Sequence, residues 1–162
     1  MKTLILVRHA KAEDPTGKGD DFDRILTKEG ERDAASMGER LRSMKINPSV
    51  IVSSSAERAI GTARIIQKRI QHTKHILLEK AIYEADVSSL MDVVWELSED
   101  AISAMLVGHN PGFTDLLHHL CETNIENIPK GGVAGIRIDT DTWASISKKS
   151  GTLLFFDSPK NK

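Results

Sequence analysis

Arginine and histidine side chains follow three apolar segments of this chain. The segments span residues 4–7, 50–52 and 105–107, and the side chains that follow them are Arg8, His9, Arg58 and His109. An arginine guanidinium donates two parallel hydrogen bonds to phosphate oxygens and keeps its charge at any working pH. A neutral histidine with an exposed nitrogen lone pair can attack phosphorus. These residue types therefore favour chemistry on a phosphoryl group.

The same four residues are expected to lie together. In open α/β sheets, ligands collect at the carboxyl ends of the strands, and each of these residues comes after an apolar segment that predicts a strand. Arg58 would lie near the start of a helix, where unpaired backbone N–H groups also attract an anion. We expect one histidine to be the nucleophile and a second, protonated histidine to stabilise charge on the transferring phosphoryl group.

Six strands are expected from short apolar runs, and helices from the amphipathic stretches between them. The strand segments are residues 3–7, 50–53, 76–78, 104–107, 135–138 and 152–156. Several are continuous apolar runs, which is typical of strands buried on both faces. Apolar side chains at helical spacing recur between them, as at Ala34, Met37, Leu41 and Met44. Strands that alternate with helices predict an α/β fold with a parallel or mixed sheet covered on both faces.

Capping residues place two helix starts. Thr27 is a candidate N-cap for a helix that includes Gly30. Asn110 is a candidate N-cap with Pro111 at the first helical position, where the missing N–H of proline does no harm. The stretch 11–24 carries five Asp or Glu, two Gly and one Pro without an apolar period, so it predicts a surface loop beside the end of the first strand.

Length and composition limit the classes of protein to which this chain can belong. Its 162 residues suffice for one domain, 1–162, and 40% hydrophobic with 28% charged residues is a globular composition. A balance of 22 Lys and Arg against 23 Asp and Glu, a net charge of −1, argues against nucleic acid or an anionic membrane as partner. The longest apolar run has four residues, too few for a membrane span or a signal peptide, so we expect a cytoplasmic protein. The single cysteine, Cys121, excludes an internal disulfide.

The motifs around the four candidate residues resemble those of the histidine phosphatase superfamily, which includes the phosphoglycerate mutases. They are Leu6-Val7-Arg8-His9, Leu26-Thr27-x-x-Gly30, Ser53-Ser54-Ser55-Ala56-Glu57-Arg58-Ala59-x-x-Thr62-Ala63 and Val107-Gly108-His109-Asn110-Pro111. The motifs lie within residues 4–112 in the family's order and are most similar to its small SixA-like branch. The resemblance implies a three-layer αβα sandwich, phosphoglycerate mutase-like, with a mostly parallel central sheet and one antiparallel strand. It also implies that His9 accepts the phosphoryl group, that Arg8 and Arg58 bind phosphate and that His109 completes the catalytic pocket.

Two departures from the family's usual pattern bear on the subgroup and on proton donation. Many members have Gly-Glu after the Arg-His pair, whereas this chain has Ala10-Lys11, which is similar to the SixA-like branch. In mutase-type members a glutamate after a short Leu-x pair donates a proton to the leaving group, and the matching segment here is Ile82-Tyr83-Glu84. Glu84 is therefore the catalytic candidate for that role, with an ordinary solvated carboxylate as the alternative. Glu13, Asp20 and Asp21 in the 11–24 loop are further candidates.

The resemblance implies a metal-independent phosphatase that works through a phosphohistidine intermediate and needs no cofactor. The adjacent His118 and His119 cannot both face one metal ion from a helix. The leading substrate is phosphohistidine on a partner protein, a phosphotransfer domain, because SixA-like proteins are associated with that reaction and a short chain leaves little length for a lid. We expect a shallow, open pocket for that reason.

Two alternatives stay open. One is a phosphatase of small phosphomonoesters, and the other is a phosphate-binding module without catalysis. A leaving alkoxide needs a proton donor more than a leaving imidazole does, so the position of Glu84 bears on the choice between the two enzyme classes.

Overall fold

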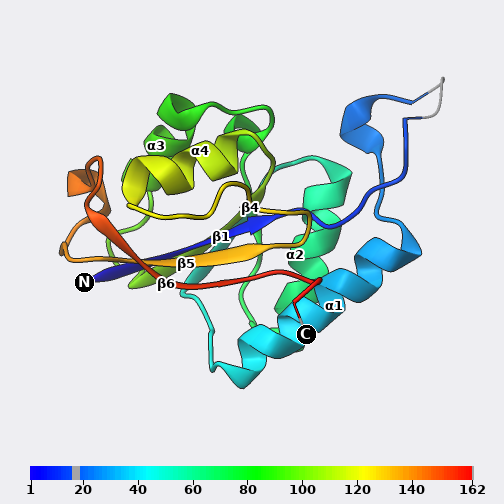
Figure 1. Ribbon diagram of the computed structural model, residues 1–162, viewed down its shortest axis with the longest axis horizontal. Coiled ribbons are helices and arrows are strands. Elements are labelled where there is room, and N and C mark those ends of the chain that lie inside the picture. Colours follow the sequence, from blue (N-terminus) through cyan, green and yellow to red (C-terminus); the bar gives the residue numbers. More distant parts are fainter. Residues whose placement is uncertain (16–18, 162) are drawn as a thin grey trace.

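A six-stranded sheet lies between two pairs of helices in the computed structural model, which describes residues 1–15 and 19–161 (Figure 1). The strands are β1 (Lys2–Arg8), β2 (Val50–Ser53), β3 (Leu77–Leu78), β4 (Ser103–Gly108), β5 (Val133–Ile138) and β6 (Gly151–Asp157). The helices are α1 (Lys28–Ser43), α2 (Glu57–Ile70), α3 (Val87–Trp95) and α4 (Gly112–Leu120). Helices α3 and α4 cover one face of the sheet and α1 and α2 the other, which confirms the three-layer αβα prediction.

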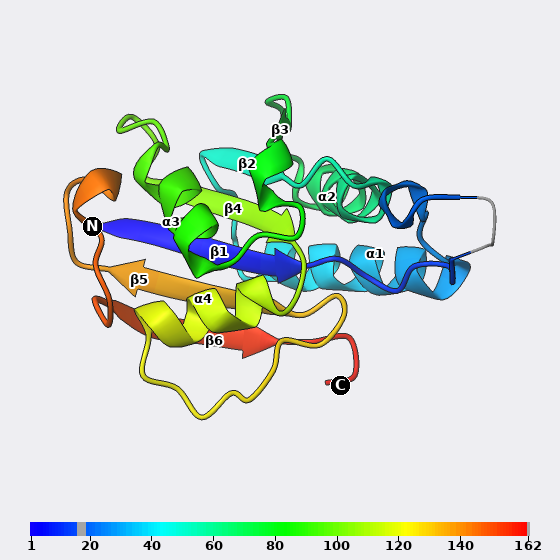
Figure 2. The same cartoon turned by 90° about the horizontal axis from the view of Figure 1, so that it is seen from above.

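The order of the strands in the sheet is β3-β2-β4-β1-β5-β6 (Figure 2). Strands β1, β2, β3 and β4 are mutually parallel, whereas β5 is antiparallel to both of its neighbours, β1 and β6. The predicted mostly parallel sheet with one antiparallel strand is therefore confirmed. The register places Arg8 opposite Gly108 and Ser53 opposite Val107, so β1, β2 and β4 end at the same level.

The apolar core fills both faces of the sheet. Leu4 and Leu6 of β1 contribute to the core beneath α3 and α4, while Ile5 and Val7 contribute to the core against α1 and α2. This arrangement explains why the strand is apolar at consecutive positions rather than at alternate ones. Trp143 is fully buried, and its indole N–H donates to the carbonyl of Ala101 over 2.9 Å.

One predicted helix start is confirmed and the other is shifted. The Thr27 hydroxyl accepts a hydrogen bond from the N–H of Gly30 over 2.9 Å, so Thr27 caps α1. Helix α4 begins at Gly112 with Pro111 at the N-cap, so the prediction of Asn110 as N-cap was wrong. Asn110, the residue before the N-cap, still forms a hydrogen bond with the first turn of α4: its Oδ1 accepts the N–H of Thr114 over 3.1 Å. Its Nδ2 meanwhile donates to the carbonyl of Ile128, which ties α4 to the loop before β5.

The acidic stretch after β1 is mainly loop, as expected, with a short 3-10 helix η1 (Asp21–Asp23). Residues 16–18 of the predicted loop lie outside the described residues. A second 3-10 turn, η2 (Lys80–Ile82), leads from β3 toward α3. Within the described part of the chain, no helix has both the length and the apolar character needed to cross a bilayer.

The first turn of α1 packs tightly against the segment that follows β1, and a substitution can test this contact. A Cβ at Gly30 would lie 2.1 Å from the carbonyl oxygen of Lys11, which itself accepts the N–H of Thr27. We expect Gly30→Ala to lower the free energy of unfolding by about 1–3 kcal/mol, because backbone must move to admit the methyl group.

The matched control is Gly61→Ala in α2. There the nearest neighbour is the flexible end of Leu26 at 3.2 Å, and alanine gains up to about 1 kcal/mol over glycine inside a helix. Urea denaturation of both variants measures the difference. Equal stability of the two variants would contradict the close contact at Gly30.

Candidate active site

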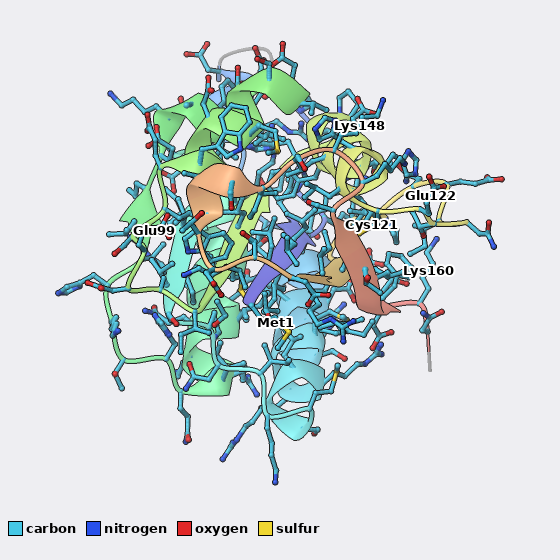
Figure 3. All side chains as sticks on the ribbon, turned by 90° about the vertical axis from the view of Figure 1, so that its left-hand side faces the viewer. Met1, Glu99, Cys121, Glu122, Lys148 and Lys160 are labelled. Carbon is cyan, nitrogen blue, oxygen red and sulfur yellow. The ribbon has the colours of Figure 1, made fainter. Side chains whose placement is uncertain are left out.

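The ends of β1, β2 and β4 bring the predicted residues together at one edge of the sheet. The N–H of His9 donates to Gly108 at the end of β4, and the N–H of Ser54 donates to Val107, each over 2.9 Å. The rings of His9 and His109 consequently lie 5.3 Å apart between centroids. Figure 3 views the molecule from the opposite end, where β1 begins at the labelled Met1.

A carbonyl group determines which nitrogen of His9 carries the proton. Nδ1 of His9 lies 2.7 Å from the carbonyl oxygen of Ala10, and because a carbonyl only accepts, Nδ1 must donate. The lone pair of the neutral ring is therefore on Nε2, which forms no hydrogen bond with a described residue. The backbone of Ala10 is held in turn by buried Thr62, whose hydroxyl accepts the N–H of Ala10 over 3.0 Å and donates to the carbonyl of Arg58 over 2.8 Å. The N-terminal part of α2 thus helps to orient the imidazole at the end of β1.

Both histidines are neutral at pH 7. Burial lowers the pKa of His9 to about 3, and the nearby His109, Arg58 and Arg8 lower it further against the opposing effect of its bond to Ala10. Burial also lowers the pKa of His109 to about 4, with Arg58 acting in the same direction. The free protein therefore does not have a protonated second histidine, and protonation of His109 beside a transferring phosphoryl group stays a prediction. Two positive guanidinium groups beside a buried imidazole disfavour a third positive charge.

Arg58 and Arg8 approach the histidines from α2 and β1. The side chain of Arg58 is only 8% exposed, and its two terminal nitrogens donate to the Asp21 carbonyl over 2.7 Å and to the Asp21 carboxylate over 3.0 Å. Arg8 donates one bond, to the carbonyl of Ile128 over 3.0 Å, and burial lowers the pKa of its guanidinium. The N-cap of α2 is Ala56, whose side chain cannot satisfy the N–H groups of the first turn. The two guanidinium groups and the uncapped N–H groups of α2 make the site attractive to an anion.

Three buried nitrogens of the site have no hydrogen-bond partner among the described residues: Nε of Arg8, Nε of Arg58 and Nδ1 of His109. In the same residues, only His72 and Arg137 have other buried side-chain nitrogens or oxygens without a partner. A buried donor without an acceptor is costly, and such groups cluster where a ligand binds. Donors from β1, from α2 and from the segment after β4 suit an oxyanion, which accepts several hydrogen bonds at once.

Aromatic and acidic side chains cover the histidines. The ring of Tyr83, just after η2, packs edge-on against His109 at 5.5 Å, and Phe22 of η1 packs edge-on against Tyr83 at 5.1 Å. The Tyr83 hydroxyl donates to the Asp21 carboxylate over 2.7 Å. His9 and His109 are therefore 7% and 8% exposed. The expectation of a shallow, open pocket stays a prediction.

The acidic candidates differ sharply in their surroundings. Asp21, which the sequence offered only as a further candidate, binds Arg58, Arg24 and Tyr83, and the hydrogen bonds from Tyr83 and Arg24 hold the pKa of its carboxyl well below its usual range. Glu84 is exposed and forms no hydrogen bond or ion pair with a described residue. Its role as proton donor stays a prediction. No sequence pattern pointed to Tyr83, although it is the residue before Glu84 in the segment Ile82-Tyr83-Glu84.

No group of three or more His, Cys, Asp or Glu side chains within residues 1–15 and 19–161 is arranged to hold a metal ion. The groups of the site that could bind an anion are two guanidinium groups, the imidazole of His109 and the backbone N–H groups at the start of α2. Such groups can stabilise the charge of a transferring phosphoryl group directly.

Solved structures show the same fold. A proposed phosphohistidine phosphatase SixA from Agrobacterium tumefaciens has a TM-score of 0.83 and 24% identity, with 98% of each chain covered. The protein histidine phosphatase SixA complexed with tungstate has a TM-score of 0.83 and 20% identity, with 97% of each chain covered. A mycobacterial glucosyl-3-phosphoglycerate phosphatase in complex with VO3 has a TM-score of 0.73 and 16% identity, over 98% of this chain and all (100%) of the other.

The sequence itself matches a family model. The match covers residues 4–129 and includes the ends of β1, β2 and β4 with Arg8, His9, Arg58 and His109. The model is that of the histidine phosphatase superfamily, branch 1, and the chain belongs to this family.

Proposed function

We propose that this chain is a phosphatase that forms a phosphohistidine on His9 and hydrolyses it with water. One observation supports this proposal most strongly. Arg8, Arg58 and His109 have buried nitrogens without a hydrogen-bond partner, and they lie next to the imidazole of His9, whose Nε2 lone pair is available. Family membership supports the same chemistry. The tungstate and vanadium oxyanions bound to two proteins of this fold are also consistent with it, since both ions resemble phosphate.

The reaction has two displacements at phosphorus. In the first, Nε2 of His9 attacks phosphorus, a P–N bond forms, and the bond from phosphorus to the leaving group breaks with its electron pair on that group. In the second, water attacks phosphorus, the P–N bond breaks with its electron pair on Nε2, and inorganic phosphate departs after loss of a water proton. The ring gains positive charge while it carries the phosphoryl group, so the bond from Nδ1–H of His9 to Ala10 strengthens in the intermediate.

Arg8, Arg58 and His109 act on the phosphoryl oxygens. Negative charge spreads over three equatorial oxygens in the transition state, and preorganised donors stabilise it there. A phosphate dianion beside His109 would raise the pKa of this histidine, because a nearby negative charge favours the protonated ring. In the protein without substrate the ring is neutral, and its tautomer decides which nitrogen of His109 carries the N–H.

Phosphohistidine on a partner protein, such as a phosphotransfer domain, is the substrate class that we propose. The carboxylate bonded to the site, Asp21, is held ionised by Tyr83 and its two arginine partners, so it has no proton to donate at neutral pH. A phosphorylated imidazole leaves more readily than an alkoxide and depends less on a proton donor. The fold shared with SixA proteins supports this class, and the fold shared with a glucosyl-3-phosphoglycerate phosphatase supports the alternative of a small phosphomonoester.

We expect His9→Ala to abolish turnover of para-nitrophenyl phosphate, because no other described histidine of the site has an Nε2 lone pair without a hydrogen-bond partner. Rapid quench of the native protein with labelled substrate should trap an acid-labile, base-stable phosphoryl group. Because the pKa of His9 lies near 3, the lone pair persists at pH 5 and labelling should occur at both pH 5 and pH 7. The assays contain EDTA, so that a divalent ion cannot contribute.

Residual activity above a few per cent in His9→Ala would remove His9 as the nucleophile. Activity that chelator abolishes and a divalent ion restores would contradict the metal-independent reaction. Binding of vanadate by the native protein without any turnover would instead support the phosphate-binding module.

Arg58→Ala should lower kcat/KM by about 10²–10³-fold, the usual effect of losing one preorganised charged donor. Arg58→Lys should recover only part of this loss, since an ammonium group cannot reproduce the planar pair of donors. The matched control is Arg64→Ala, an exposed arginine on the same helix. If Arg58 served only as the ion-pair partner of Asp21, folded Arg58→Ala would keep kcat/KM within about threefold of wild type.

The substrate class is tested by comparing a phosphohistidine-bearing phosphotransfer domain with an alkyl phosphate. We expect the higher kcat/KM on the phosphoprotein, and we expect Glu84→Gln to behave there like Glu96→Gln, a control at another exposed carboxylate. A preference for the alkyl phosphate, with a loss of about 10²–10⁴-fold in Glu84→Gln only, would establish Glu84 as the proton donor and the ester as the substrate.

A further inference from the structure

A buried serine contacts the second histidine of the site. Ser54 follows β2 directly and is fully buried, and its hydroxyl oxygen lies 2.7 Å from Nε2 of His109. The backbone fixes the position of Ser54, because its N–H donates to Val107 in β4 over 2.9 Å. Val107 is two residues before His109 on the same chain segment, so the serine and the histidine are tied to one strand end.

Counting hydrogens at Ser54 determines the direction of its bond to His109. The hydroxyl oxygen already accepts the N–H of Ala56 over 3.2 Å, and a hydroxyl has one hydrogen to donate. Apart from Nε2 of His109, the described residues provide no acceptor for that hydrogen. If His109 donated to Ser54 instead, both the serine hydrogen and the Nδ1 lone pair would be buried without a partner, whereas the reverse direction leaves only Nδ1–H unpartnered and free to donate to a ligand. The hydroxyl therefore donates to Nε2, and the ring proton of neutral His109 is on Nδ1.

We propose that Ser54 is a positioning residue that holds His109 in the Nδ1–H tautomer, so that this N–H donates to the phosphoryl oxygens; this role rests on the proposed function. Nδ1 of His109 is one of the three buried nitrogens without a partner. With the proton there, Nδ1 binds an oxyanion, whereas a lone pair at the same place would repel it. Ser54 acts through the imidazole.

Both neutral histidines therefore carry their ring proton on Nδ1, but a different nitrogen of each ring is left for the substrate. His9 turns its Nδ1–H inward to the Ala10 carbonyl and leaves the Nε2 lone pair for phosphorus. His109 accepts the Ser54 hydroxyl at Nε2 and leaves Nδ1–H for the phosphoryl oxygens. Different neutral partners, a carbonyl acceptor and a hydroxyl donor, therefore make one ring a nucleophile and the other a donor.

Nuclear magnetic resonance measures the tautomer without any need for activity. Two-bond ¹H–¹⁵N correlations of the protein labelled with ¹⁵N-histidine distinguish Nδ1–H from Nε2–H rings, and the spectrum of His109→Gln assigns the His109 signals. At pH 7 we expect the Nδ1–H pattern for His109 in wild type and its loss or averaging in Ser54→Ala. The matched control is Ser53→Ala, which removes a buried hydroxyl that bonds to the Ser54 carbonyl and to neither imidazole.

An Nε2–H pattern for His109 in wild type would overturn the proposal. So would a pure Nδ1–H pattern that persists in Ser54→Ala. Neither result depends on turnover, so the tautomer claim is decided even if the chain proves not to be a phosphatase, in which case the proposed function fails separately.

Kinetics with para-nitrophenyl phosphate test the consequence for the reaction. Ser54→Ala should lower kcat/KM by roughly 5- to 150-fold, the range for one lost buried hydrogen bond, mainly through kcat because the donor acts in the transition state. Ser54→Thr keeps the hydroxyl and should restore the Nδ1–H pattern and most of the activity. Equal losses in Ser54→Ala and Ser53→Ala would show a general packing effect and overturn the positioning role.

Discussion

Two imidazoles and two guanidinium groups share a nearly buried space at the end of this sheet, and the rest of the site depends on that constraint. His9, His109 and Arg58 are each less than one-tenth exposed, so water screens their charges poorly. Four positive charges in this space would repel one another strongly, and the imidazoles, which can lose a proton, are the groups that become neutral. The arginines keep their charge, and Asp21 provides a compensating negative charge beside Arg58.

The hydrogen-bond partner of His9 orients the ring without adding a negative charge beside it. A carboxylate at Nδ1 of His9 would favour the imidazolium form, which has no lone pair for attack on phosphorus. The partner is instead the carbonyl of Ala10, which fixes the proton without adding charge. Thr62 then links the N–H of the same residue, Ala10, to the backbone of Arg58, so that one turn of α2 connects the segment of the nucleophile with an arginine of the site. Uncharged groups thus set the orientation of the ring, while burial and the neighbouring arginines lower its pKa.

Sequence patterns predicted the elements and the main site residues because these depend on short segments of chain. Three apolar runs in the sequence predict the strands that end at Arg8, Ser53 and Gly108. Because these strands pair in parallel, their ends meet at one edge of the sheet. Thr27 capped its helix as predicted because the capping bond spans only three residues. The cover over the site could not be predicted in this way. Asp21 meets Arg58 across 37 positions of the sequence and Tyr83 across 62, and no local pattern specifies such contacts. The sequence could not predict that His109 is neutral, because its pKa is lowered by burial and by a nearby arginine, and both arise only in the folded chain.

The distribution of polar groups in this site favours the phosphoryl group over the leaving group. Guanidinium, imidazole and backbone donors surround the place where phosphate would bind, while the neighbouring carboxylate of Asp21 is occupied by an arginine pair and a tyrosine. Such a site stabilises charge on the phosphoryl oxygens for any phosphate compound, because those oxygens are common to all of them. Selection among substrates must then come from how readily each leaving group departs without help, and from how it fits beside Tyr83 and η1. A P–N bond to imidazole meets the first condition better than a P–O bond to an alkyl group, which is why the chemistry of the leaving group, rather than affinity for phosphate, separates the two substrate classes.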